Sequence, residues 1–215
     1  MGNWAFNMKY DFESVEGIRI LFKDVTDRLY ENHGCLIKRD LDERTISGCL
    51  MHELNILLGN ERYNDKKIYA DIEYNRNGLD PKRIINIDLA FCYDDTRRES
   101  KSLNEKDDYK ACNEESVRDK LFRPDIIIHT RNINNDEGNL VVVEVKKRVN
   151  GKHHDDIDFD LLKLARLYKD NNYQYKHHIY YEYDKDNKKD VKAYHLRGVN
   201  CKGDYCFEEL ALFSK

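Results

Sequence analysis

The sequence has no long apolar run and no recognisable leader. No stretch reaches the roughly 18 consecutive apolar residues that a bilayer-spanning helix needs. Residues 1–10 lack a basic head joined to an apolar core, which a secretory leader would have. We therefore expect neither membrane insertion nor export, and a protein that works in the cytoplasm.

The chain also lacks an excess of positive charge. Its net charge is −4 and its isoelectric point about 6.1, which argues against a protein that coats nucleic acid through its overall field. Any contact with nucleic acid must therefore be local. One local cluster of basic residues exists, although such a cluster can also be a solvated strand end. It comprises Lys146, Lys147, Arg148 and Lys152.

Cysteines with metal-ligand spacing are scarce. The six cysteines are scattered, and thiols in a reducing compartment are the expected state. Cys201 and Cys206 could form half of a zinc site with the histidine pairs 153–154 or 177–178, but no second pair has suitable spacing. A zinc-stabilised domain is the alternative that this spacing leaves open.

The length and the charge pattern predict one domain. A chain of 215 residues can bury one good core but is short for two. We expect a single domain over 1–215, with N-terminal helices in 1–60 and a core in 61–200. Segment 94–119 is strongly charged with few large apolar residues, so we expect an exposed insertion there.

Hydrophobic periodicity predicts helices before strands. A helix is predicted over 14–33, with Ser14 as N-cap and Gly34 as stop, and another over 43–58 between Asp42 and Gly59. A third helix begins at Asp155 or Asp156, and its apolar face is Ile157, Leu161, Leu164, Ala165 and Tyr168. Predicted strands are 67–75, 83–92, both arms of a hairpin over 124–148, 173–183 and 190–197. This order predicts an α/β sandwich with a central mixed β-sheet flanked by helices.

The central hairpin separates its polar and apolar residues onto two faces. Pro124-Asp125 opens one apolar strand, and Glu144-Val145-Lys146 ends the other. Because successive side chains of a strand point to opposite faces, the acids and the lysine share one face while residues of the other parity face the core. Those core-facing residues are Ile126, Ile128, Val141, Val143 and Val145.

Asp125 and Glu144 have the spacing of a metal site. Opposed side chains in such a pair have Cβ atoms about 5 Å apart, and two carboxylates that close repel unless a cation lies between them. Oxygen ligands suit Mg²⁺ or Mn²⁺, and the carbonyl of Val145 could add one more. Lys146 could then assist the attacking water or stabilise the charge of a phosphate, which suits phosphodiester hydrolysis.

At these residues the sequence resembles the PD-(D/E)xK nuclease superfamily, because Pro124-Asp125 and Glu144-Val145-Lys146 match its signature in order and in strand context. Wider stretches between Glu43 and Arg197 are similar to small, standalone bacterial members. The resemblance implies a restriction-endonuclease-like three-layer sandwich and a further glutamate from a helix before the sheet. Glu43, near the middle of that helix's apolar stripe, is our choice, and Glu53, at its edge, is the alternative.

The resemblance implies a Mg²⁺- or Mn²⁺-dependent nuclease, for which DNA is the expected substrate, although the sequence does not distinguish DNA from RNA. The implied metal ligands are Asp125, Glu144, the Val145 carbonyl and Glu43, with Lys146 as a catalytic residue. Lys147, Arg148 and Lys152 would contact nucleic acid. The alternative is a module that keeps the fold but only binds nucleic acid or protein. A homodimer would suit cleavage of both strands, although no interface is readable from the sequence.

Overall fold

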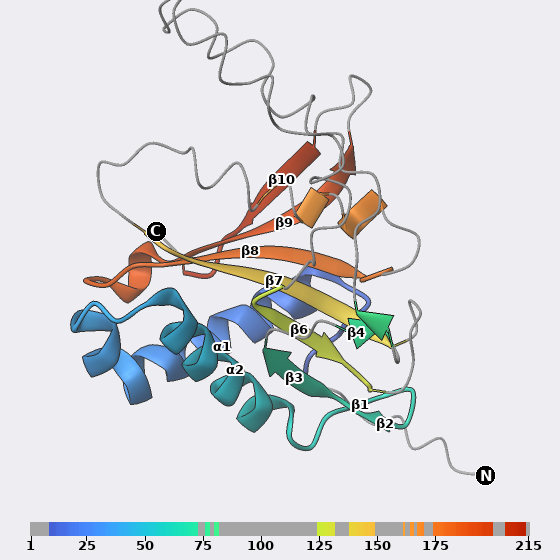
Figure 1. The fold of residues 1–215 in the computed structure, drawn as a ribbon, viewed down its shortest axis with the longest axis horizontal. Coiled ribbons are helices and arrows are strands. Elements are labelled where there is room, and N and C mark those ends of the chain that lie inside the picture. The colour runs from blue at the N-terminus through green and yellow to red at the C-terminus, as the bar shows by residue number, and fades with distance from the viewer. Residues whose placement is uncertain are drawn as a thin grey trace, which may run out of the picture.

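The computed structural model describes residues 9–72, 76–77, 80–81, 124–131, 138–148, 161, 164–165, 167–169, 174–199 and 205–213. Its main feature is a six-stranded mixed sheet. The strands are β3 (Tyr69–Ile72), β6 (Ile126–His129), β7 (Asn139–Lys147), β8 (His177–Tyr183), β9 (Lys192–Val199) and β10 (Tyr205–Leu210). Their order in space is β10-β9-β8-β7-β6-β3 (Figure 1). The chain thus has the predicted α/β character with a mixed sheet.

Helix α1 (Val15–Lys38) starts where the sequence predicts and ends later. The side chain of Ser14 accepts a hydrogen bond of 3.1 Å from the Gly17 N–H, which confirms the predicted N-cap. The predicted stop at Gly34 is wrong. A glycine inside a helix costs only about 1 kcal/mol, and α1 continues for another turn. The chain leaves the helical conformation at Asp40, whose φ is +64°.

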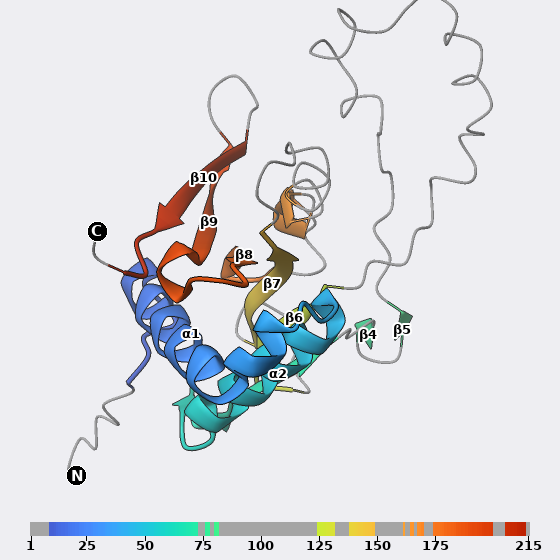
Figure 2. The same ribbon diagram turned by 90° about the vertical axis from the view of Figure 1, so that its left-hand side faces the viewer.

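Helix α2 (Glu43–Leu58) has the predicted bounds. The side chain of Asp42 accepts a hydrogen bond of 2.8 Å from the Thr45 N–H, and Gly59 follows the last turn. Figure 2 shows α1 and α2 side by side along the molecule. The two helices therefore form a hairpin, joined by residues 39–42.

The helix pair packs on one face of the sheet. In the hairpin, Ile126 is paired with Val143 and Ile128 with Val141, as the predicted register requires. The core under α1 and α2 contains all five residues that parity assigned to it. The five predicted core-facing residues are therefore confirmed, and strand parity places Glu144, between Val143 and Val145, on the face away from this core.

The other face of the sheet carries a second, smaller core. Residues 161, 164–165 and 167–169 are helical, as predicted for the third helix, and Leu164 and Leu167 pack against Ile127, Val142 and Tyr180. The assignment of Tyr168 to the apolar face is wrong, since Tyr168 is exposed and Leu167 takes that place. Strands β7 and β8 run parallel, which requires a crossover connection such as this helix.

Of the other predicted strands, some are found in the structure and others lie partly or wholly outside the described residues. Predicted strands 173–183 and 190–197 correspond to β8 and β9, whereas β10 and the 3₁₀ turn η4 (Lys188–Asp190) were not expected. Segment 67–75 begins at the end of β2 (Lys66–Lys67), which pairs with β1 (Arg62–Tyr63), and continues as β3. A further short pair is β4 (Arg76–Asn77) with β5 (Asp80–Pro81). Strand 83–92 and the insertion 94–119 lie outside the described residues.

The expectations of no membrane-spanning helix and of cysteines as thiols can be compared with the described residues only. Within these ranges, no helix is long and apolar enough to cross a bilayer. Cys35, Cys49 and Cys206 are thiols rather than disulfides. Cys201, the other half of the zinc alternative, lies outside the described ranges.

Candidate active site

The candidate site lies where β6 stops and β7 continues. Asp125 directly precedes β6, whose first residue is paired with Val143, so β7 extends past it on that side. Oδ2 of Asp125 accepts a hydrogen bond of 2.7 Å from the N–H of Val145. The aspartate side chain thus continues the strand pairing by one step and lies against the middle of Glu144-Val145-Lys146.

Glu43 occupies the next position along the same edge. It belongs to the first turn of α2, and its Oε1 accepts a hydrogen bond of 3.3 Å from the N–H of Lys147. Alternate N–H groups of a strand point to the same side, about 6.6–7 Å apart. Asp125 and Glu43 therefore bind neighbouring N–H groups on the open edge of β7.

Lys146 bridges toward the helix. Its Nζ donates a hydrogen bond of 3.2 Å to Oε2 of Glu43, and its side chain is 27% exposed. This pair is well placed to hold the ammonium group at the mouth of the site while leaving it within reach of solvent. From the sequence, a common site for Glu43 and Lys146 was a hypothesis. In the structure the two side chains are in contact.

Glu144 is the buried member of the group. The residue is 2% exposed and lies between Val143, which faces the helices, and Val145, which also faces them. Its side chain is therefore on the opposite face, with Val142. Burial makes the charged form of a carboxyl costly, so this position favours a cation nearby.

A pocket of about 560 Å³ opens beside Asp125. It is lined by Asp42, Glu43, Arg44, Ser47, Ile72 and Asp125. The first four come from the N-terminal end of α2, while Ile72 ends β3. No sequence pattern selects Arg44, Ser47 or Ile72, because these residues come together only through the packing of α2 on the sheet.

The donor set fits a divalent cation held by two carboxylates. The N–H and C=O of a strand residue point to the same side, so the carbonyl of Val145 is directed to the edge that Asp125 occupies. Mg²⁺ is commonly held by one or two carboxylates while waters and substrate phosphates complete its shell. Within the described ranges, no group of three or more His, Cys, Asp or Glu side chains could hold a metal ion. Of the predicted ligands, Asp125 contacts the backbone of Val145, the residue after Glu144, whereas Glu43 contacts Lys146.

The residues predicted to bind nucleic acid take part in ion pairs. Nζ of Lys147 is paired with Asp40. Nε of Arg148 lies 3.6 Å from Oε1 of Glu182, and its Nη1 donates to the carbonyl of Asp190. These contacts tie the end of β7 to its surroundings. Lys152 lies outside the described residues.

Glu53 lies inside the helix pair and not at the site. It is 2% exposed and accepts hydrogen bonds from Arg28 at 2.6 Å and from Asn32 at 3.0 Å, and its Oε1 is 3.0 Å from Nε2 of His33. The helical wheel placed Glu43 deeper than Glu53, and that order is wrong, because Glu43 is 42% exposed. Glu43 lies in the first turn of α2, beside the edge of the sheet. A helical wheel gives the angle of a residue around the axis but not its position along the axis, so it does not predict the exposure of such a residue.

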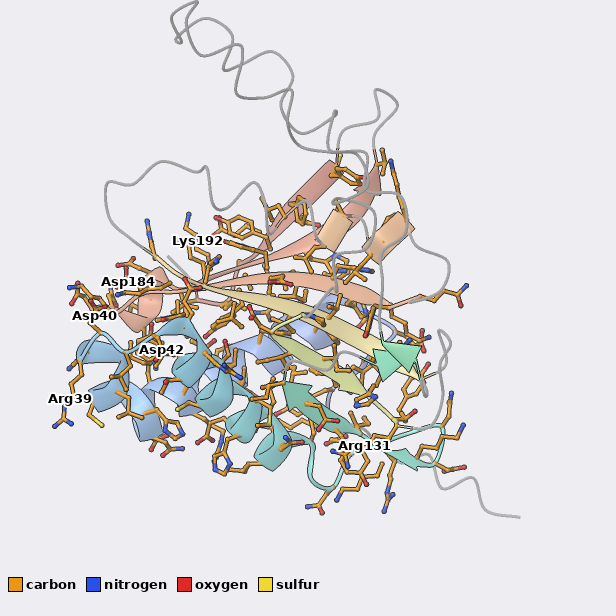
Figure 3. All side chains as sticks on the ribbon, in the orientation of Figure 1. Arg39, Asp40, Asp42, Arg131, Asp184 and Lys192 are labelled. Atoms are coloured by element: carbon orange, nitrogen blue, oxygen red, sulfur yellow. The ribbon has the colours of Figure 1, made fainter. Side chains whose placement is uncertain are left out.

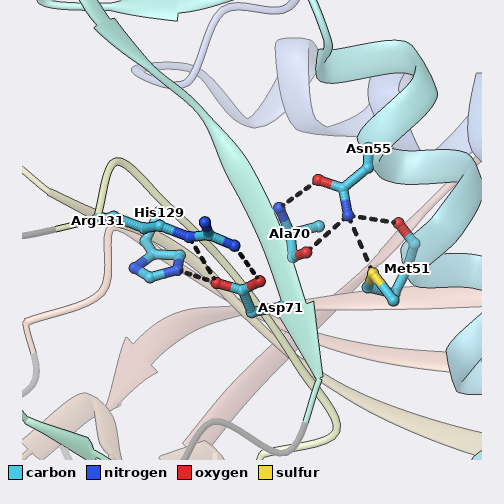
Figure 4. A network of polar contacts seen from close by, with 6 residues as sticks. All are labelled: Met51, Asn55, Ala70, Asp71, His129 and Arg131. Atoms are coloured by element: carbon cyan, nitrogen blue, oxygen red, sulfur yellow. Dashed lines mark hydrogen bonds and ion pairs between the residues drawn. The ribbon is translucent and has the colours of Figure 1, made fainter.

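A second polar network joins β3 to β6 and was not anticipated (Figure 4). Oδ2 of Asp71 lies 2.8 Å from Nε2 of His129, and Arg131 donates to both carboxylate oxygens, at 2.7 and 3.1 Å. The hydrogen bond from His129, followed by that from Arg131, lowers the pKa of Asp71 to about 2 although burial opposes this. Figure 3 shows Arg131 well separated from Asp42, while Asp71 directly precedes Ile72, which lines the pocket.

Comparison with protein-family models, with curated proteins and with solved structures finds no match to this chain.

Proposed function

We propose that the protein is a Mg²⁺-dependent nuclease with a site of the PD-(D/E)xK type and a restriction-endonuclease-like core. The observation that carries the proposal is the 2.7 Å hydrogen bond from the Val145 N–H to Oδ2 of Asp125. It brings the aspartate of one short motif against the centre of the other. DNA is the first substrate to test, and RNA the second.

The chain's own residues would divide the work. Asp125, Glu144 and the Val145 carbonyl would hold Mg²⁺, which lowers the pKa of a bound water and polarises a phosphoryl oxygen. Glu43 would position Lys146, whose Nζ lies 3.2 Å from its carboxylate. The ammonium group of Lys146 would then donate a hydrogen bond to the phosphate oxygen on which negative charge develops. Arg44, from the pocket wall, supplies a second cationic group near the phosphate.

The direct test is cleavage by the purified protein. Supercoiled, linear duplex and single-stranded DNA, together with RNA, would be incubated with Mg²⁺, with Mn²⁺ and with a chelator. We expect metal-dependent cleavage of at least one DNA form that is lost in Asp125→Asn. No cleavage of any substrate, or equal cleavage by Asp125→Asn, would reject the proposal.

The second candidate is a binding module that keeps the fold without catalysis. Two observations favour it: Lys146 is already paired with Glu43, and among the described residues no group of three or more His, Cys, Asp or Glu side chains could hold a metal ion. Mn²⁺ titration by calorimetry separates the two functions. A nuclease should lose Mn²⁺ affinity on Asp125→Asn, whereas a silent module should bind the ion equally weakly before and after the change.

A further inference from the structure

We propose that Cys35 of α1 and Cys49 of α2 form a reversible disulfide across the helical hairpin when the protein meets a peroxide. The inference concerns the helix pair and is independent of the nuclease proposal. It identifies a modification site for a small oxidant, about one and a half helical turns from Glu43.

The contacts of Glu53 fix which levels of the two helices face each other. Glu53 bonds Arg28 and Asn32, which lie about one turn apart on α1, so the level of Glu53 falls between those of the two residues. Because α1 and α2 run in opposite directions, a step toward the connecting loop adds residues on α1 and subtracts them on α2. Three residues after Asn32 comes Cys35, and four residues before Glu53 comes Cys49. The two cysteines therefore lie at one level, a single turn from the Glu53 cluster.

The two cysteines also share the same side of the pair. At 100° per residue, Arg28, Asn32 and Cys35 fall within about 60° on α1, and Cys49 lies about 40° from Glu53 on α2. Helices packed with axes 8–10 Å apart, each with Cα atoms at a radius near 2.3 Å, bring directly facing Cα atoms to roughly 3.4–5.4 Å. This range overlaps the Cα separation of disulfides, which is about 4.4–6.8 Å.

Both thiols can be reached by a small reagent. Cys35 is exposed and Cys49 is partly exposed. Burial, followed by the charges of Glu53 and Cys35, raises the pKa of the Cys49 thiol. Since the thiolate is the reactive form, Cys35 is the residue that the oxidant meets first and Cys49 is the resolving thiol.

The reaction balances with one peroxide per disulfide. The Cys35 thiol loses its proton and the thiolate attacks hydrogen peroxide; the O–O bond breaks, the sulfur keeps one hydroxyl group as sulfenic acid, and the other leaves as hydroxide and takes up the released proton to form water. The Cys49 thiol then attacks the sulfenic sulfur, forms the S–S bond and releases the hydroxyl group as a second water. Two thiols lose two electrons, and the peroxide gains them. A small thiol reductant reverses the change.

The consequence is a closed loop around the start of α2. The disulfide would enclose the connection and the first turn, which include Asp42 and Glu43. Constraint of the unfolded chain by a loop of this length raises the melting temperature by up to about 10 °C. Oxidised protein should therefore melt at a higher temperature than reduced protein.

The test uses the full chain and hydrogen peroxide. Wild-type protein would be oxidised, alkylated, digested without reductant and analysed by mass spectrometry. We expect a peptide that links Cys35 to Cys49, lighter by two hydrogen atoms than the two thiol peptides, which disappears with dithiothreitol. Cys35→Ser and Cys49→Ser should each abolish it, and the control Cys206→Ser should retain it.

Each other outcome rejects the inference. Absence of the linked peptide in oxidised wild type, or linkage of Cys35 to a different cysteine, would contradict the proposed pairing. A melting temperature that rises on oxidation equally in wild type and in Cys35→Ser would assign the stabilisation to another bond. Circular dichroism of the reduced variants establishes that the serine substitutions leave the helices folded.

Discussion

Oδ2 of Asp125 accepts a hydrogen bond from the backbone N–H of Val145, so one carboxylate both ends the β6 pairing and enters the candidate site. Two kinds of substitution separate these roles. Asparagine keeps an acceptor oxygen of the same shape, whereas alanine removes it. The stability and the chemistry of this position can therefore be measured apart.

Asp125→Asn should abolish metal-dependent cleavage while leaving the fold stable. Loss of the negative charge weakens the cation site, and we expect activity to fall at least about 100-fold. Asp125→Ala should lose activity and also lower the free energy of unfolding by about 1.5–3 kcal/mol, because the Val145 N–H loses a charged acceptor. Urea unfolding and a cleavage assay on both variants make the comparison. Equal activity in Asp125→Asn and wild type would contradict the metal role.

Neighbouring lysines should respond differently to the same substitution. Lys146→Met removes the ammonium group that Glu43 holds, and we expect cleavage to fall about 10²–10⁴-fold, as for loss of a group that transfers or donates a proton in the transition state. Lys147→Met removes the partner of Asp40 and a cation predicted to contact nucleic acid, so at saturating DNA it should change the cleavage rate less than about threefold. Single-turnover rates at saturating Mg²⁺ are the measurement. A larger loss from Lys147→Met would show that the wrong lysine was chosen.

The two helix glutamates form a second matched pair. Glu53→Ala removes a buried carboxylate from Arg28, Asn32 and His33, and we expect unfolding to become easier by about 2–4 kcal/mol. Glu43→Ala removes a half-exposed side chain and should change stability by less than about 1 kcal/mol, yet lower the cleavage rate. Thermal unfolding and cleavage are measured on both variants. Glu53→Ala should show the larger loss of stability, and Glu43→Ala should lower the cleavage rate with little loss of stability. Identical profiles would remove the distinction between them.

The sequence predicts features that depend on near neighbours. Caps at Ser14 and Asp42 and the register of the central hairpin were correct, because each follows from residues within a few positions or from strand parity. The depth of Glu53 was not, since a wheel gives angle but not the level at which α1 contacts α2. The bond between Asp71 and His129 spans 58 positions, and local pattern carries no signal for it.

Acid should destabilise the protein through buried histidines of β8 and β9. Burial lowers the pKa of His195 to about 4 and that of His178 to about 3, from 6.5. Between those values the unfolded chain binds more protons than the folded one, so their contribution is fully present above about pH 6.5 and decreases as the pH falls toward 4. Because one unit of pKa shift corresponds to about 1.4 kcal/mol for each group, urea unfolding should show a loss of several kcal/mol over this window. His195→Gln should flatten the slope, and a constant free energy of unfolding would contradict the assignment.

Asn55 protects the exposed edge of β3, which is the last strand of the sheet that the described residues form. Its amide donates to the carbonyl of Ala70 at 2.7 Å, and its carbonyl accepts from the Ala70 N–H at 3.0 Å, so one side chain acts as a further strand (Figure 4). Asn55→Ala leaves two backbone groups of a residue only 1% exposed without these partners, which should cost about 2–4 kcal/mol.

Amide hydrogen exchange reports the loss of these hydrogen bonds at Ala70 directly. Its amide proton should exchange with solvent faster in Asn55→Ala than in wild type, while the amide of Ile127, in the neighbouring strand, should keep its protection under native conditions. Asn55→Asp is the graded control, since a carboxylate still accepts from the Ala70 N–H but repels its carbonyl oxygen, and it should fall between the two. An uncovered edge of β3 could also pair with a strand of another chain, so the alanine variant should aggregate at a lower protein concentration than wild type. Unchanged exchange at Ala70 would mean that the side chain does not seal this edge in solution.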